Sequence, residues 1–202
     1  MDNESPQVLC PSLSHAVLDF RHCNSHLVVD PPLPLGHNLH TLSLTWVTQS
    51  SLTLSTLRGI LVGNASTLRL LRALPAMDWP ELHQEIAHSL PILEHLERLH
   101  VDITVRDGDF TTLHRLIESM PKSYQTLEMT DIRFSPETCS KLVDFLAAAP
   151  RIKPKELTIH GFGLVQAEWL RKLIKEKLDI PFRWIRTSSL DHSSFDVEFT
   201  WT

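Results

Sequence analysis

The chain has 202 residues, of which 42% are hydrophobic, so it can form one domain with a sizeable core and is not wholly disordered. Its net charge of −5 disfavours a dedicated nucleic-acid-binding protein, which would usually be basic. No apolar run is long enough to span a membrane, and the acidic start does not resemble a signal peptide. The three cysteines include no Cys-x-x-Cys pair, which favours an intracellular protein, cytoplasmic or nuclear.

Short Leu-x-hydrophobic segments recur along the chain. Residues 1–12, which precede them, are predicted to be disordered, and residues 31–34 form a proline-rich loop. The segments are spaced by about 28 residues, a length that suits one strand and one helix. Their first residues are Leu18, Leu42, Leu68, Leu99, Leu127 and Leu157.

Helical patterns fill most of the intervals between these segments. Residues 78–93 begin with Asp-Trp-Pro-Glu, which is typical of a helix N-terminus, and then place apolar residues at helical spacing. Alternation of strand and helix predicts a parallel sheet with helices on one side. The other predicted helices are residues 51–62, 109–120, 135–149 and 165–178.

Two segments carry a longer pattern, Leu39-x-x-Leu42-x-Leu44 and Leu96-x-x-Leu99-x-Val101. With 33 leucines in the chain, residues 13–187 resemble a leucine-rich repeat array of the ribonuclease-inhibitor-like kind. The resemblance implies an α/β solenoid of six to seven repeats, with a parallel sheet on the concave side and helices outside. The alternative is a non-repetitive α/β domain whose leucines fill the core, although no glycine-rich phosphate-binding motif occurs.

The C-terminal residues 188–202 are predicted to cap the array. Phe195, Val197 and Phe199 alternate with polar residues, which is the pattern of a half-buried strand. Residues 182–185 could form a seventh strand before it. We therefore expect a C-terminal capping hairpin, since a terminal repeat would otherwise expose the core.

No set of residues has the spacing of a known catalytic or metal site. His83 and His88 are five residues apart, whereas zinc-binding His-Glu-x-x-His pairs are four apart. The cluster of Cys10, His15, His22, Cys23 and His26 matches no zinc-finger spacing, and Cys139 lies within a predicted helix, which favours a core position. We therefore expect no enzymatic activity, no cofactor and no metal, with a zinc-binding or enzymatic protein kept as an alternative.

The residues between the strand leucines point to the opposite face of the sheet and are mostly polar. The repeat resemblance implies a monomeric protein-interaction module that binds a protein partner on this concave face, without nucleic acid or membrane. A similarity to fungal F-box-like repeat proteins implies an alternative, recruitment of substrates to a ubiquitin ligase, although residues 1–12 are too short for an F-box. The predicted contact residues are Arg98, His100, Asp102, Glu128, Thr130, Thr158 and His160.

Overall fold

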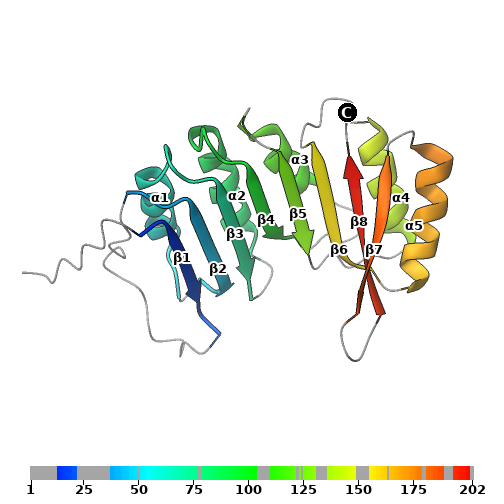
Figure 1. Ribbon diagram of the computed structural model, residues 1–202, viewed down its shortest axis with the longest axis horizontal. Helices are drawn as coiled ribbons and strands as arrows, with labels where there is room; N and C mark the ends of the chain where they lie inside the picture. The colour runs from blue at the N-terminus through cyan, green and yellow to red at the C-terminus, as the bar shows by residue number, and fades with distance from the viewer. Residues whose placement is uncertain are drawn as a thin grey trace, which may run out of the picture. The chain divides into compact units, whose positions relative to one another are not determined.

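The computed structural model describes residues 13–21, 37–49, 51–76, 79–103, 110–121, 123, 125–130, 136–148, 155–162, 164–178, 181–188 and 193–200. The chain divides into two compact units. The first contains Met1–Glu97 and Pro121–Ser123, and the second contains Arg98–Met120 and Tyr124–Thr202. From β2 to β7, strands alternate with helices along the chain, whereas β1 and β2, and likewise β7 and β8, follow one another without a described helix between them (Figure 1).

The described residues of the first unit form three parallel strands in chain order. They are β1 (His15–Asp19), β2 (Thr41–Val47) and β3 (Leu70–Pro75). Helix α1 (Leu54–Gly63) begins after Thr53, whose side chain accepts a hydrogen bond from the backbone N–H of Thr56. Helix α2 (Pro80–Ser89) has a proline in its first turn, where no backbone donor is lost, and it continues into the short 3-10 helix η1 (Leu90–Ile92).

The third strand differs in register from the sequence prediction. Leu71 pairs with Leu42 and Ala73 pairs with Leu44, and all four side chains are buried. The predicted strand has Leu68 and Leu70 on its inner face; Leu68 is buried but precedes β3, and Leu70 is only half-buried. Leucines at 68, 70 and 71 allow both registers locally, and pairing with β2 selects between them because a one-residue slip exchanges the two faces of a strand.

Within the described part of the second unit, five strands lie in the order β4-β5-β6-β8-β7. Strands β4 (Arg98–Asp102), β5 (Thr126–Thr130) and β6 (Glu156–Phe162) are parallel, whereas β8 (Ser193–Thr200) is antiparallel to both β6 and β7 (Phe182–Ser188). Its helices are α3 (Thr111–Glu118), α4 (Pro136–Ala148) and α5 (Leu164–Lys177). No helix in the described part of the chain combines the length and hydropathy that crossing a lipid bilayer requires.

The core of the second unit confirms the predicted pairing of its three parallel strands. Leu99 is opposite Leu127, Leu127 is opposite Leu157, and all three are fully buried. Cys139 of α4 is also buried, as predicted. Burial raises the pKa of this thiol to about 11, so it stays protonated at neutral pH and lacks the reactivity of a thiolate.

The prediction of a leucine-rich repeat solenoid over residues 13–187 is wrong. The predicted seventh strand, β7, does not lie beside β6 as a further parallel repeat, because β8 pairs between them in the antiparallel direction. The chain also divides at Glu97 into two compact units. The structure is an α/β fold with mostly parallel strand pairing, and not a clear solenoid.

The error has a physical reason. A buried Leu-x-Leu strand followed by an amphipathic helix is required wherever helices cover a parallel sheet, so the pattern identifies the alternation but not a solenoid. The two predicted C-terminal strands are present and form an antiparallel hairpin. The predicted disorder of residues 1–12 concerns a segment outside the described residues.

Replacing Leu127 with aspartate should unfold the second unit. The substitution places an unpaired carboxylate among fully buried side chains, which should lower the free energy of unfolding by about 3 kcal/mol or more. Thermal unfolding followed by circular dichroism measures the effect. Val165→Asp is the control, because Val165 of α5 is 76% exposed and should tolerate a charge. A Leu127→Asp variant that melts with the wild type would contradict this register.

Candidate metal centre

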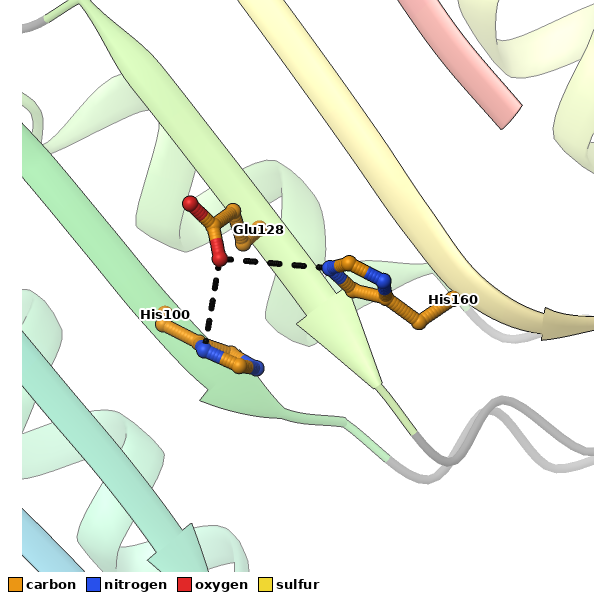
Figure 2. A group of neighbouring side chains, drawn as sticks. All are labelled: His100, Glu128 and His160. Atoms are coloured by element: carbon orange, nitrogen blue, oxygen red, sulfur yellow. Dashed lines mark ion pairs between the residues drawn. The ribbon is translucent and has the colours of Figure 1, made fainter. Parts of the chain in front are cut away.

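Three polar side chains meet on the face of the second unit's sheet that lies opposite the buried leucines. His100 comes from β4, Glu128 from β5 and His160 from β6, and they point toward one another (Figure 2). His100 is directly opposite Glu128 in the parallel register. Glu128 is opposite Thr158, so His160 lies on the diagonal, two residues further along β6. Three neighbouring strands therefore supply one side chain each.

The three side chains are close enough to share one small ligand. One nitrogen of each histidine and one carboxylate oxygen of Glu128 all lie within 4.8 Å of one another. Glu128 Oε2 is 3.4 Å from His100 Nδ1 and 3.9 Å from His160 Nε2. The two imidazole rings are stacked with their centroids 5.7 Å apart. Their side chains are 15% and 29% exposed, so the cluster is partly sheltered but still reached by solvent.

A fourth residue, Asp196 of β8, contacts the cluster from the next strand. Its Oδ2 lies 3.0 Å from Nδ1 of His160, a hydrogen-bond distance, and its side chain is only 9% exposed. The other ring nitrogen of His160, Nε2, is buried and makes no hydrogen bond to any residue that the structure describes. His160 therefore uses one nitrogen on Asp196 and directs the other toward Glu128.

The charges in this cluster shift the pKa values of two members in opposite directions. The neighbouring carboxylate of Glu128, followed by that of Asp196, favours the protonated imidazole and raises the pKa of His160 above its ordinary value, against the opposing effect of burial. His160 is also the largest influence on Glu128, with smaller contributions from His100 and Arg98, and together they lower the pKa of that carboxyl.

Two imidazoles and one carboxylate form a ligand set suited to a transition metal. Imidazole nitrogen suits zinc, iron, copper and nickel, whereas calcium and magnesium prefer oxygen ligands alone. Ligand atoms around a tetrahedral zinc ion lie about 3.3 Å apart, since each bond is about 2.0–2.1 Å long. The His100–Glu128 separation of 3.4 Å matches this value. The His160–Glu128 separation of 3.9 Å has to shorten by about 0.6 Å, which side-chain rotation can supply.

The predicted contact residues share this polar face, as expected from strand alternation, but only some of them meet. The cluster unites His100, Glu128 and His160, and the nearby Arg98 is exposed. Thr130 belongs to β5, but its side chain lies outside the described residues. Asp102 and Thr158, both half-buried, complete the predicted set. Whether any of these residues contacts a partner protein stays a prediction.

Neither the cluster of metal-ligating side chains nor the contact of Asp196 with it is among the sequence predictions. The available signal was positional, because His100, Glu128 and His160 occupy equivalent faces of three successive predicted strands. The histidines considered as metal ligands from their spacing in the sequence lie elsewhere. His83 is buried and His88 is exposed on α2, so they do face different ways. The N-terminal cysteines and histidines, which match no zinc-finger spacing, include four that lie outside the described residues: Cys10, His22, Cys23 and His26.

A shallow pocket of about 400 Å³ between α3 and α4 is the second candidate site. Phe110 and Phe145 stack in it with ring centroids 5.6 Å apart. Its charged residues are already paired, Lys141 with Glu137 at 3.0 Å and Asp144 with Lys177 at 2.6 Å. These are ordinary ion pairs on helix surfaces, so this pocket is a weaker candidate for a functional site than the cluster of His100, Glu128 and His160.

The comparisons with known proteins leave the family open. No protein-family model and no curated protein matches the chain. A solved structure of a human methyltransferase 10 domain containing protein is similar over 57% of this chain and 67% of that chain, with a TM-score of 0.34 and 8% sequence identity. A likeness this low says nothing about function.

The predicted protein-interaction module, with its ubiquitin-ligase alternative, is wrong as a reading of this chain. It depended on the solenoid, which the antiparallel insertion of β8 between β6 and β7 contradicts. Nothing in the comparisons supports the expectation that the chain has no enzymatic activity, either.

The opposite pKa shifts predict a pH window for the attraction between Glu128 and His160. The contribution of Glu128 to stability is present above its unfolded-state pKa and is lost as the pH falls through its lowered folded-state value. The contribution of His160 is present below its unfolded-state pKa and is lost as the pH rises through its raised folded-state value. The attraction should therefore be greatest at about pH 5.5.

Glu128→Gln should accordingly lower the free energy of unfolding most at about pH 5.5, by no more than about 1 kcal/mol because the pair is partly exposed. The difference from wild type should shrink toward pH 9 and toward pH 2. Denaturant unfolding at the three pH values, without added metal, measures it. Glu118→Gln is the control, since Glu118 pairs with His114 at 3.1 Å on the exposed surface of α3. A Glu128→Gln effect that does not vary with pH would contradict the assignment.

Proposed function

We propose that this protein binds a divalent transition-metal ion through His100, Glu128 and His160. The observation that carries the proposal is the convergence of three metal-ligating side chains from three adjacent strands within 4.8 Å. Strands hold these residues at fixed separations, so little conformational entropy is lost when an ion binds.

The buried nitrogen of His160 supports the same proposal. A buried imidazole nitrogen without a hydrogen bond is costly, and a metal ion that binds its lone pair would remove that cost. Nε2 of His160 is such an atom, and the carboxylate that it faces would coordinate the same ion. An ion between them would satisfy both groups.

The ligand set also favours a site with an accessible coordination position. Structural zinc sites are closed by four protein ligands, whereas catalytic zinc sites use three and leave the fourth to water or substrate. The cluster offers three ligand residues from the described part of the chain, and its side chains are partly exposed. A metal ion held here would polarise a bound water molecule or a substrate oxygen.

Zinc titration of metal-free protein at about pH 8, where fewer protons compete for the histidine nitrogens than at lower pH, should show one ion bound with an affinity that depends on the cluster. His160→Ala and Glu128→Gln should each weaken that affinity more than about 100-fold, because even residues that only support a ligand contribute 10–100-fold. Isothermal titration calorimetry measures binding, and the absorption spectrum of cobalt-substituted protein reports the ligand set.

His114→Ala is the matched control, since it removes a histidine that also pairs with a glutamate but lies on the exposed surface of α3. It should bind zinc as tightly as the wild type does. Zinc binding that survives in His160→Ala would place the metal elsewhere in the chain. A wild-type protein that binds no zinc, cobalt or iron(II) would show that the cluster is an ion-pair network only.

A further inference from the structure

The contact between His160 and Asp196 adds a second layer to the candidate metal centre. In the antiparallel pairing of β6 with β8, Ile159 is opposite Val197 and Thr158 is opposite Glu198. Asp196 therefore reaches the sheet face at the level of His160, where its Oδ2 is 3.0 Å from Nδ1. The contact joins neighbouring strands and does not depend on a loop.

A neutral imidazole can carry its proton on either ring nitrogen, and only the other nitrogen can bind a metal ion. The carboxylate of Asp196 accepts a hydrogen bond from Nδ1–H, so it favours the form whose proton is on Nδ1. The lone pair is then on Nε2, the buried nitrogen that faces Glu128 at 3.9 Å. Nδ1 thus donates to Asp196, and the lone pair of Nε2 is directed toward Glu128.

We infer that Asp196 is a positioning residue of the metal centre, which holds His160 in the ring orientation and tautomer that direct Nε2 to the ion. The inference rests on the proposed metal binding and deepens it. Asp196 does not touch the ion; it acts through His160.

The burial of Asp196 supports this role. A carboxylate with a side chain only 9% exposed is costly to keep in a folded protein unless hydrogen bonds or opposite charges compensate it. His160 supplies such a compensating contact. A carboxylate that only maintained solubility would lie on the surface, as Glu118 does with a side chain 67% exposed.

Glu198 offers a matched control on the same strand. It lies two residues from Asp196, faces the same side of the sheet and carries the same charge. Its Oε2 accepts hydrogen bonds from Arg183 of β7 at 2.8 and 3.2 Å, and its side chain is 18% exposed. Removing Glu198 changes the local charge as much as removing Asp196 does, but it leaves the His160 contact intact.

The test compares zinc affinity in wild type, Asp196→Ala, Asp196→Asn and Glu198→Ala at about pH 8. Asp196→Ala should weaken binding about 10–100-fold, and Glu198→Ala should change it less than about threefold. Asp196→Asn keeps an oxygen that accepts the Nδ1 proton, so it should bind more tightly than Asp196→Ala. Thermal unfolding of each metal-free variant shows whether the fold is kept.

Nitrogen-15 NMR of the metal-free protein measures the tautomer of His160, which a change in stability alone would not alter. The imidazole shifts of His160 should report the Nδ1–H form in wild type and in Asp196→Asn, and a larger share of the Nε2–H form in Asp196→Ala. Zinc binding by Asp196→Ala within twofold of wild type, with the same tautomer, would overturn the inference and leave the proposed function standing. A wild-type protein that binds no metal would overturn both.

Discussion

In-register pairing of β4, β5 and β6 determines both the core and the polar cluster of the second unit. Successive side chains of a strand point to opposite faces, so burial of Leu99, Leu127 and Leu157 places His100 and Glu128 together on the other face. Burying one large apolar side chain contributes about 1.5–3 kcal/mol, so the six that β4, β5 and β6 bury contribute on the order of 10 kcal/mol. They are Leu99, Val101, Leu127, Met129, Leu157 and Ile159. A partly exposed ion pair contributes about 1 kcal/mol at most. The core therefore selects the register, and the cluster follows from it.

Strand β8 covers the edge of the parallel strands at β6 and adds Asp196 to the polar face. A parallel sheet that ended at β6 would leave that strand's backbone groups unpaired at an edge. The antiparallel β8 covers the edge and brings in Val197 and Phe199, which are fully buried, with Asp196 between Phe195 and Val197 in the chain. Because the pairing runs antiparallel, Asp196 reaches His160 while Glu198 lies opposite Thr158. The same strand thus extends the core on one face and supports the cluster on the other.

Sequence periodicity predicts which strand residues are buried, but it does not predict which polar side chains contact one another. Local alternation is enough to show that Leu99, Leu127 and Leu157 are buried and that His100, Glu128 and His160 share the opposite face. It cannot show which diagonal neighbours meet, because that depends on sheet twist and on side-chain rotamers. Glu128 and His160 are diagonal neighbours on adjacent strands, so alternation alone does not predict their contact.

Two sequence predictions were wrong because the outcome depends on contacts between residues far apart in the sequence. At β3, adjacent leucines allowed two registers, and only the neighbouring β2 distinguishes them. At the C-terminus, the local pattern predicts each strand. It does not predict that β8 lies between β6 and β7, because strand order depends on contacts between residues far apart in the sequence. The contact of Asp196 with His160 depends on that insertion, so the sequence pattern does not predict it.

The charges of the cluster give a reason for a cation to bind there. With His160 protonated, Glu128 and Asp196 contribute two negative charges against one positive charge, which leaves the group of three with a net charge of −1. A divalent ion that replaces the imidazole proton brings the same three residues and the ion to zero. The ion and the proton compete for one nitrogen, so binding releases a proton where His160 is charged. The attraction that raises the pKa of His160 is therefore the same attraction that the ion would use, and the ion has twice the charge of the proton it replaces.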